Sequence, residues 1–319
     1  RHGVQFTYKN QRYSLTRALA YHYLMADGTP FQNQEGWQTM QYNQEFTGRD
    51  PRMAQTIAAP DYVAVGADAS SKYYPSCKDY ERSGYRPIKY FSDDTHDGAT
   101  TSTTDYAIFR YGEVLLNYAE AKAELGQADQ TVIDETINVI RARVGMPGLD
   151  VAKANAAPDA FLSSYYTDKH LEDANKGLIL EIRRERTVEL VNEGFRLWDM
   201  LRWHEGQQIC PASNTLGPGF IGCWFPGLGE YDMNNDGKPD LCIYSGSTPQ
   251  TDCDNTLNVA PGKDNTLSEG TSGYLVQFKD QTYKWEEKDY LYPIPNKQMQ
   301  IYPIDETTGK SVLTQNPGY

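Results

Sequence analysis

The sequence lacks long apolar runs and any excess of basic residues. None of its segments approaches the roughly 18 consecutive apolar residues of a membrane-spanning helix, and the mean hydropathy is −0.68. It has 30 Lys and Arg residues and 43 Asp and Glu residues, which gives a net charge of −13. An acidic surface without a basic stripe repels a polyanion. The composition therefore argues against nucleic acid as a partner and against a helical membrane span within this chain.

Signatures of common active sites are missing as well. The sequence contains no GxSxG, no GxGxxG after a strand, no phosphate-binding P-loop and no HExxH, and its five histidines share no ligand spacing. An enzyme would have to rely on Asp and Glu pairs that no pattern singles out, and every acidic protein supplies such pairs. We therefore expect a protein that is not an enzyme.

Cysteine is sparse, and the five cysteines include no CxxC pair, which argues against structural zinc. Four of them lie between residues 210 and 253. This spacing permits one or two disulfides in an oxidising compartment and leaves at least one thiol over, with the pairing open. The chain starts with Arg1 and shows no secretion-signal pattern, so we interpret its N-terminus as processed or truncated.

Composition divides the chain into three regions, which we expect to form one compact domain. Residues 1–104 are loop-rich and face the ligand, with one predicted helix over residues 14–25 that Ser14 caps. Residues 105–203 form a helical scaffold. Residues 204–319 are loop-rich and end in an extended tail, which we expect to lie against the body through its tyrosines and prolines. The predicted fold class is mainly α, with large loop-rich, short-strand insertions.

The segment 105–145 predicts a tetratricopeptide-like pair of antiparallel helices. Apolar residues step by three and four along the first helix at Tyr111, Val114, Tyr118, Ala121 and Leu125. They do so along the second helix at Ile133, Ile137, Ile140 and Val144. The turn between the two helices is short, so they pack side by side and span about one tetratricopeptide repeat. Such a pair needs neighbouring helices to bury its outer faces.

The stretch 178–203 predicts one long helix that carries a crowded set of charges. Glu181 and Glu185 lie one turn apart and would repel each other on a solvated face, while three arginines and Glu189 occupy the same two turns. We therefore expect a partly buried ionic network that pairs these side chains with other helices. A solvated helix with incidental charges is the alternative. A catalytic carboxylate pair is not expected, because the arginines would hold both glutamates ionised.

One loop has the donor spacing of a calcium site. Its sequence YDMNNDGKPD spaces oxygen donors around a glycine, and the candidate ligands are Asp232, Asn234, Asp236, Lys238 through its carbonyl, and Asp240. The bidentate Glu of a full EF-hand is replaced by Ile243, and no flanking helices are evident. We expect calcium to stiffen this loop, and a simple turn between two strands is the alternative.

Several segments, spread over nearly the whole chain, resemble the SusD/RagB family. They are RDPR (49–52), GY (84–85), AIFRYGEVLLNYAEA (107–121), INVIRARV (137–144), EIRRER (181–186), EGFRLWDMLRW (193–203), LYPIP (291–295) and NPGY (316–319). The order of these motifs is more specific than any one of them. The family's signal, lipid-bearing cysteine and earlier helix pairs are not in this sequence.

The resemblance implies a surface-exposed outer-membrane lipoprotein of Bacteroidetes that binds oligosaccharides, or in some members peptides. Such proteins are not enzymes and close over a SusC-like TonB-dependent transporter. The implied scaffold is a stack of tetratricopeptide-like helix pairs, and the membrane would be reached only through a lipid anchor outside this chain. Similar Asp/Asn loops in the family favour calcium.

The 24 tyrosines point to possible ligand-binding residues, because a tyrosine offers both a flat apolar face and a hydroxyl to a sugar ring. Aromatic clustering in the long loops singles out Trp37, Tyr42, Tyr73 and Tyr74 as candidates, with ordinary packing as the alternative. Three other functions stay open. The chain could bind peptides, act as a helical-repeat adaptor for proteins, or hydrolyse glycans through an unrecognised carboxylate pair.

Overall fold

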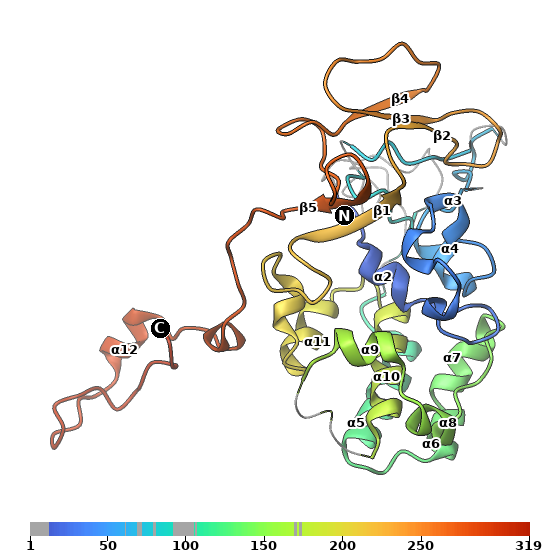
Figure 1. Ribbon diagram of the computed structural model, residues 1–319. Coiled ribbons are helices and arrows are strands. Elements are labelled where there is room, and N and C mark those ends of the chain that lie inside the picture. The colour runs from blue at the N-terminus through green and yellow to red at the C-terminus, as the bar shows by residue number, and fades with distance from the viewer. Residues whose placement is uncertain are drawn as a thin grey trace.

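The computed structural model describes residues 13–60, 62–68, 72–78, 81–91, 105, 107–168, 171 and 174–319. Most of the regular structure is helical (Figure 1). The α-helices are α2 (Arg17–His22), α3 (Tyr42–Glu45), α4 (Pro51–Thr56), α5 (Tyr111–Glu124), α6 (Gln130–Asp134), α7 (Ile137–Arg143), α8 (Val151–Ala156), α9 (Ala160–Tyr165), α10 (Lys176–Glu189), α11 (Arg196–Arg202) and α12 (Asn296–Ile301). Short 3-10 helices are η1 (Phe31–Asn33), η2 (Trp37–Thr39), η4 (Gly206–Ile209) and η5 (Glu287–Tyr290). The strands are β1 (Phe220–Phe225), β2 (Gly229–Tyr231), β3 (Leu241–Tyr244), β4 (Asn255–Asn258) and β5 (Gly273–Gln277). A mainly helical body with short strands agrees with the predicted fold class.

Helix α10 lies at the centre of the helical part of the molecule. It packs against α2, α4, α5, α8 and α9 (Figure 1). Gly177 lets the start of α10 approach α8, because a side chain at this position would collide with the backbone of Ala154. The apolar core around α10 includes Leu116, Ala119, Ile133, Ile137, Leu162, Leu178, Leu180 and Ile182. Burial of these side chains provides the main driving force for assembling the helices.

The charged side chains of α10 are buried in an ionic network, which confirms the sequence prediction. Glu185 accepts from Arg52 at 2.9 Å and from Arg141 at 2.6 Å. Arg184 contacts the Asp159 carboxylate at 2.6 Å. The remaining pairs of α10 include Glu181 with Arg141, Glu189 with Arg110 and Arg143, and Arg186 with Asp199. The network therefore ties α10 to α4, α7, α11 and the segments that precede α5 and α9.

Two of the predicted helices are shorter than expected. The stretch 178–203 splits into α10 and α11, because Asn192 and Gly194 adopt φ values of 62° and 86°, in the left-handed region that ends a helix. The helix predicted over residues 14–25 covers only α2, and its N-cap is Thr16 without a side-chain hydrogen bond. The capping role predicted for Ser14 is therefore wrong.

The helix pair forms, but the predicted apolar stripe of α5 does not face the core. Tyr111, Val114, Tyr118 and Leu125 are 45–70% exposed. The buried face instead consists of Leu115, Leu116, Ala119 and Ala123, which pack towards α7 and α10. On the partner side, Ile133, Ile137 and Ile140 are buried as predicted, although the second helix breaks into α6 and α7 at Thr136.

Two small sheets form at the opposite end of the body. Strand β1 pairs antiparallel with β5, and β3 lies between antiparallel β2 and parallel β4. Figure 1 shows β2, β3 and β4 at the end away from α5, α6 and α8. A second apolar core draws on distant parts of the chain, namely Leu15, Tyr23, Tyr42, Met53, Tyr85, Val188, Phe225, Leu241, Leu257 and Leu275.

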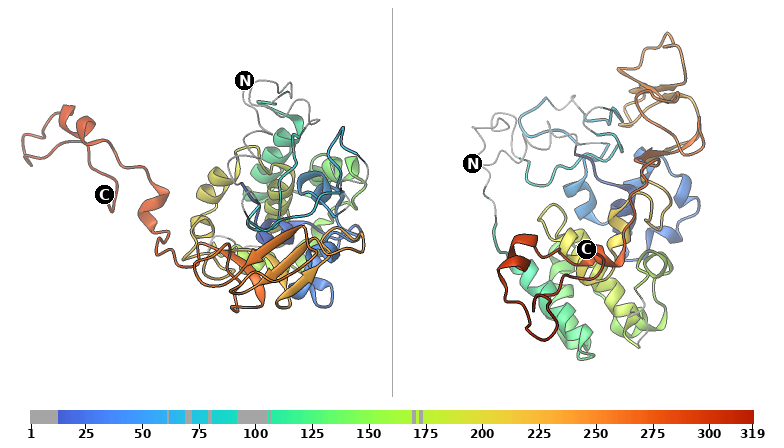
Figure 2. Two further views of the ribbon diagram at one scale, coloured as in Figure 1. Left: turned by 90° about the horizontal axis from the view of Figure 1, so that it is seen from above. Right: turned by 90° about the vertical axis from the view of Figure 1, so that its left-hand side faces the viewer.

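The C-terminal tail leaves the body instead of lying against it. Trp285 and Tyr290 form the last contacts, since Tyr290 stacks on His204 at 4.2 Å between ring centroids and accepts the Gly206 amide at 2.9 Å. Beyond this point the chain, including α12, extends away from the helices (Figures 1 and 2). Tyr292, Tyr302 and Tyr319 are exposed. The prediction that these tyrosines pack on the body is therefore wrong.

Candidate functional site

The Asp/Asn loop connects β2 to β3 as a tight turn whose carboxylates receive backbone amides. Asp232 accepts the amides of Asn234 at 3.2 Å and Gly237 at 2.8 Å. Asp236 accepts the amide of Lys238 at 2.9 Å. Because Asp and Asn side chains readily bond to backbone two residues on, these contacts follow from the local sequence. The turn holds several oxygen atoms close together.

Asp240 is the buried member of this set, with 3% of its surface exposed. It accepts the Met233 amide at 2.8 Å and the Asn234 amide at 3.2 Å. Burial raises the pKa of Asp240 to about 6. The Met233 amide opposes this shift, and the nearby Asp236 and Asp232 charges add to it. Its carboxylate is therefore under electrostatic stress at neutral pH, which a bound cation would relieve.

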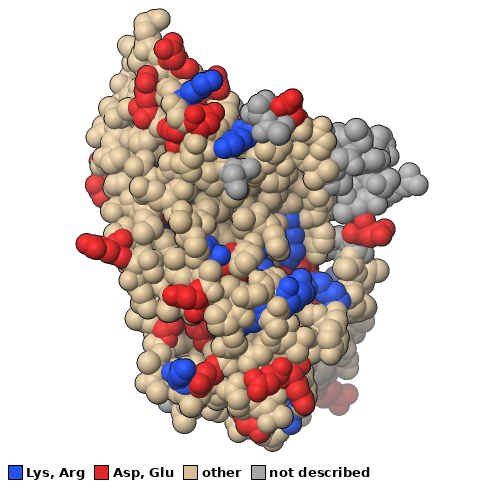
Figure 3. Space-filling view, turned by 90° about the vertical axis from the view of Figure 1, so that its right-hand side faces the viewer, with Lys and Arg blue, Asp and Glu red and all other residues tan. Residues whose placement is uncertain are grey.

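The loop forms one wall of an acidic cavity of about 640 Å³. The cavity is lined by Lys72, Tyr74, Asn234, Asp236, Lys238, Pro239, Asp240, Asp252 and Asp254. Acidic side chains gather over this end of the molecule (Figure 3). Four carboxylates and the Asn234 amide give an oxygen-rich donor set that fits a hard cation such as calcium. Asp252, Asp254 and Lys72 were not predicted, because they reach the cavity from other segments.

Tyr74 is the predicted aromatic residue that lines this cavity. Its hydroxyl donates to Asp254 at 3.0 Å. Partial burial, followed by this bond to Asp254, raises the pKa of Tyr74 to about 12. The structure thus brings one predicted ligand-binding residue together with four of the predicted metal ligands, although about 160 residues separate them in sequence.

The other three aromatic candidates occupy different surroundings. Tyr42 is 1% exposed and its hydroxyl donates to the Ala58 carbonyl, so its ring offers no face to a ligand, in contrast to the prediction. Trp37 is half-buried and packs edge-on against Tyr21 at 5.0 Å between ring centroids. Tyr73 is half-buried, donates to Glu81 at 3.1 Å and packs against Tyr62.

An open groove of about 750 Å³ adjoins the Asp/Asn loop at Asn235. It is lined by Glu35, Gly36, Thr39, Met40, Asn43, Gln44, Thr47 and Asn235. Asn43 joins the groove to the loop by donating to the Asp232 carbonyl at 3.1 Å and to the Asn235 side chain at 3.0 Å. Amide, hydroxyl and carboxylate groups in an open groove can hydrogen-bond to sugar hydroxyls.

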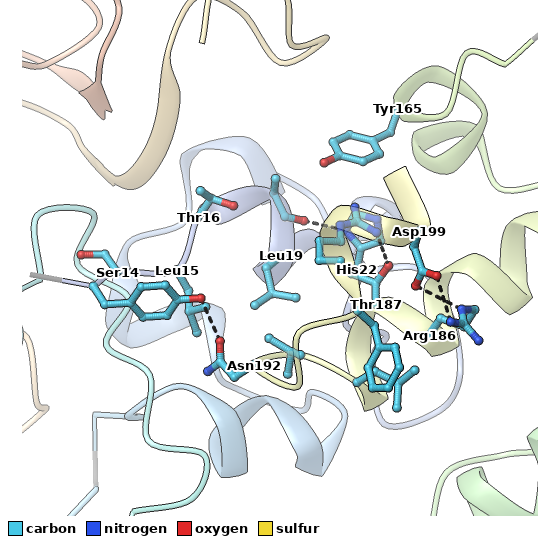
Figure 4. Close-up of a pocket in the computed structure, with 16 residues that line it drawn as sticks. Ser14, Leu15, Thr16, Leu19, His22, Tyr165, Arg186, Thr187, Asn192 and Asp199 are labelled. Carbon is cyan, nitrogen blue, oxygen red and sulfur yellow. Dashed lines mark hydrogen bonds and ion pairs between the residues drawn. The ribbon is translucent and has the colours of Figure 1, made fainter. Parts of the chain in front are cut away.

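A smaller cavity of about 230 Å³ lies between α2 and the ends of α10 and α11 (Figure 4). Its charged groups pair with each other, because Arg186 contacts Asp199 at 2.9 Å. Tyr13 donates to Asn192 across its mouth at 3.0 Å. Burial lowers the pKa of His22 well below its usual value, so this imidazole stays neutral. The cavity is therefore mainly apolar and internally paired, unlike the acidic one.

In the part of the chain that the structure describes, no helix is long and apolar enough to cross a bilayer. A SusD-like protein, P38 of Formosa agariphila, is 32% identical over 114 residues, which cover 35% of this chain and 20% of that protein. Among solved structures, a SusD-like carbohydrate binding protein of Bacteroides fragilis aligns with a TM-score of 0.56 and 23% identity, over 89% of this chain and 46% of the other. A second SusD-like protein of that organism aligns with a TM-score of 0.53 and 22% identity, over 98% and 50%.

The solved relatives share the fold of this chain, which spans about half of their length. A family model described as the SusD family matches residues 6–319. Since this match extends over nearly the entire sequence, the chain belongs to the SusD family.

Proposed function

We propose that this chain is the ligand-binding part of a surface glycan-binding protein that captures oligosaccharides and delivers them to a SusC-like TonB-dependent outer-membrane transporter. The family match over residues 6–319 carries this proposal. One structural neighbour is named as a carbohydrate binding protein, and the open polar groove beside Asn43 supplies groups suited to sugar hydroxyls. The protein would act by binding alone, with its tetratricopeptide-like pair of α5 and α7 as scaffold and a lipid anchor outside these residues.

Affinity electrophoresis through gels that contain different glycans, combined with an assay for released reducing sugar, tests this function. Retarded migration without sugar release is the expected result. Steady release would identify a hydrolase instead. A lack of both effects across the panel would overturn glycan binding and leave peptide cargo or a protein-adaptor role, which peptide-library binding then separates.

Tyr74 is the residue that we propose for ring stacking, because it is the predicted aromatic that lines a cavity. Tyr74→Ala should weaken retardation by about tenfold, since one stacked ring contributes about 1–1.5 kcal/mol. Tyr283→Ala is the matched control, because Tyr283 is 55% exposed and does not line the cavity. Equal retardation of both variants would remove Tyr74 from the binding site.

We also propose that calcium binds the acidic cavity through Asp232, Asn234, Asp236, Asp240 and the Lys238 carbonyl. The presence of Asp252 and Asp254 beside this loop favours the proposal, because they add oxygen donors from a separate segment. The ion would stiffen the loop between the cavity and the groove.

Calorimetric titration of chelator-treated protein with calcium tests this site. Binding by the unmodified chain and its loss in Asp236→Asn are expected. Asp280→Asn removes an equal charge from an exposed position and should bind normally. An unmodified chain that takes up no calcium would contradict the proposal.

A further inference from the structure

The five cysteines, scattered in sequence, are not scattered in space. Cys77 lies in a loop before Tyr85, Cys223 in β1, Cys242 in β3, and Cys253 just before β4. Cys210 follows η4. The structure gathers the first four into two pairs, each of which joins a loop to a strand.

Cys77 and Cys223 form the buried pair, since neither exposes any surface. The two thiols lie within hydrogen-bonding reach, and Cys223 is the main cause of the raised pKa of Cys77. Backbone contacts hold both residues in place. The Cys77 carbonyl accepts from Asn265 at 2.9 Å, and the Cys223 amide donates to Ser83 at 2.8 Å.

Gly84 makes room for both sulfur atoms of this pair. A side chain at Gly84 would collide with the Cys223 sulfur and would lie 3.4 Å from the Cys77 sulfur. The φ of Gly84 is +86°, and that of Cys77 is 56°, a left-handed conformation that a residue with a Cβ seldom adopts. The loop is thus shaped around the two sulfurs.

Cys242, in the middle strand of the three-stranded sheet, and Cys253, just before β4, form the second pair. Their sulfur atoms lie within 4.8 Å of each other and of a Glu230 oxygen. The Cys253 amide donates to Thr251 at 3.1 Å, and the Thr251 hydroxyl donates to Glu230 at 2.6 Å. These bonds fold the 245–254 loop back over β2 and β3 and place Cys253 over Cys242.

We propose that this protein carries two disulfides, Cys77–Cys223 and Cys242–Cys253, and that Cys210 remains a thiol. In each pair two S–H bonds break and one S–S bond forms, and the two electrons and two protons pass to a disulfide-bearing oxidant of the cell envelope, whose S–S bond breaks to give its dithiol. An oxidising compartment is required, and the proposed location at the cell surface provides one.

The second disulfide would act on the acidic cavity. Asp252 and Asp254, which line that cavity, flank Cys253 directly. A covalent link from Cys253 to β3 would hold both carboxylates beside Asp240, which immediately precedes β3. The first disulfide would instead tie the loop at Cys77 to β1 and close a covalent ring between residues far apart in the sequence.

The set of Glu230, Cys242 and Cys253 could alternatively hold a soft metal ion such as zinc. The disulfide is the better assignment, because Glu230 is exposed and already accepts from Thr251, which leaves two sulfur atoms as the close partners. A four-ligand structural zinc site needs more donors than these.

The test uses the full chain refolded with oxidised glutathione, so that its outcome does not depend on where the protein resides. The protein is then denatured, alkylated with iodoacetamide without reductant, and analysed by intact and peptide mass spectrometry. Alkylation of Cys210 alone, with peptides cross-linked as Cys77–Cys223 and Cys242–Cys253, is the expected result. Five alkylated cysteines, or other pairings, would overturn the assignment.

Two variants separate the pairs. Cys253→Ser should free Cys242 for alkylation and leave the Cys77–Cys223 peptide intact, and Cys210→Ser should leave both cross-links and no alkylated cysteine. If Cys77→Ser fails to fold, the Cys253→Ser peptide map still reports on the buried pair. Zinc retained at one equivalent, with Cys242 and Cys253 both alkylated after chelation, would overturn the second disulfide.

Discussion

Two buried carboxylates of this molecule, Glu185 in α10 and Asp240 in the acidic cavity, respond to burial in opposite ways. Burial alone would raise the pKa of Glu185, but the guanidinium groups of Arg52 and Arg141 outweigh it and lower this pKa to about 2. Asp240 is also buried, but it meets backbone amides and two further aspartates, and its pKa rises to about 6. The cluster of Glu185 with Arg52 and Arg141 is therefore electrostatically complete, whereas the acidic cavity is an incomplete cluster.

This difference distinguishes a structural cluster from the proposed cation site. In α10 every glutamate that points inward is matched by arginine, so a further ion would gain little there. Lys72 and Lys238 line the acidic cavity, yet neither forms an ion pair with its carboxylates in the described part of the chain. Unmatched carboxylates held close by a folded loop gain stability when a cation binds them.

Removal of one charge from the complete cluster should have the largest effect. Glu185→Ala removes a carboxylate that Arg52 and Arg141 share, so their buried positive charges lose part of their compensation. We expect a loss of about 3–5 kcal/mol in the free energy of unfolding, measured in urea. Lys153→Ala is the control. Its pair with Asp150 spans 3.7 Å on the surface, so the loss should stay below about 1 kcal/mol. Equal losses in the two variants would show that burial of the network does not matter.

The two clusters should affect the free energy of unfolding in different pH ranges. Glu185 has a folded pKa of about 2, below its ordinary 4.5, so its stabilisation is complete above about pH 4.5 and is lost as the pH falls towards 2, by about 2–3 kcal/mol. Asp240 has a folded pKa of about 6, above its ordinary 3.8, so the folded state becomes more stable as the pH falls from 6 to about 4. Stability should therefore peak near pH 4–5.

Urea titrations at a series of pH values can assign the two parts of the stability profile, one below pH 4.5 and one between pH 4 and 6, to the two groups. Glu185→Gln should flatten the loss below pH 4.5, and Asp240→Asn should flatten only the change between pH 4 and 6. If Asp240→Asn changed the loss of stability below pH 4.5 instead, the assignment of these groups would be wrong.

The sequence anticipated the complete cluster better than the incomplete one, for a physical reason. Glu181 and Glu185 lie one turn apart and repel each other unless cations pair with them, and this is a local pattern. A buried network could therefore be inferred without knowing that Arg52 and Arg141 supply the positive charges. The turn around Asp232 was equally local. Asp252, Asp254 and Tyr74 reach the acidic cavity only because distant loops pack together. The spacing of residues along the sequence does not predict such packing.

The position of α5 illustrates the opposite error. Tyr111, Val114 and Tyr118 repeat at helical spacing, yet Leu115, Leu116 and Ala119 on the neighbouring face are the buried ones. Two apolar faces compete on this helix, and small Ala119 permits the closer approach to α10. Periodicity predicted the helix correctly but could not decide which face meets the core.

Acid should weaken calcium binding at the incomplete cluster. Protons compete with calcium for the Asp240 carboxylate, whose pKa is about 6, so affinity should fall about tenfold between pH 7 and pH 5, or about 1.4 kcal/mol. Calorimetry at the two pH values measures this change. Asp240→Glu keeps a carboxylate at this position, so calcium binding to this variant should also weaken in acid. An affinity that is identical at both pH values would show that calcium does not use Asp240.

The smallest expected effect separates the ring of Tyr74 from its hydroxyl. Tyr74→Phe removes the 3.0 Å bond to Asp254 at a half-exposed position and should lower the free energy of unfolding by about 0.5–1 kcal/mol. Glycan retardation should persist in this variant, because the ring that would stack on a sugar is unchanged. Retardation lost in Tyr74→Phe as fully as in Tyr74→Ala would show that the hydroxyl, and the Asp254 carboxylate that it orients, makes the contact with the sugar. The carboxylates of the acidic cavity would then bind the glycan themselves, and added calcium should compete with it.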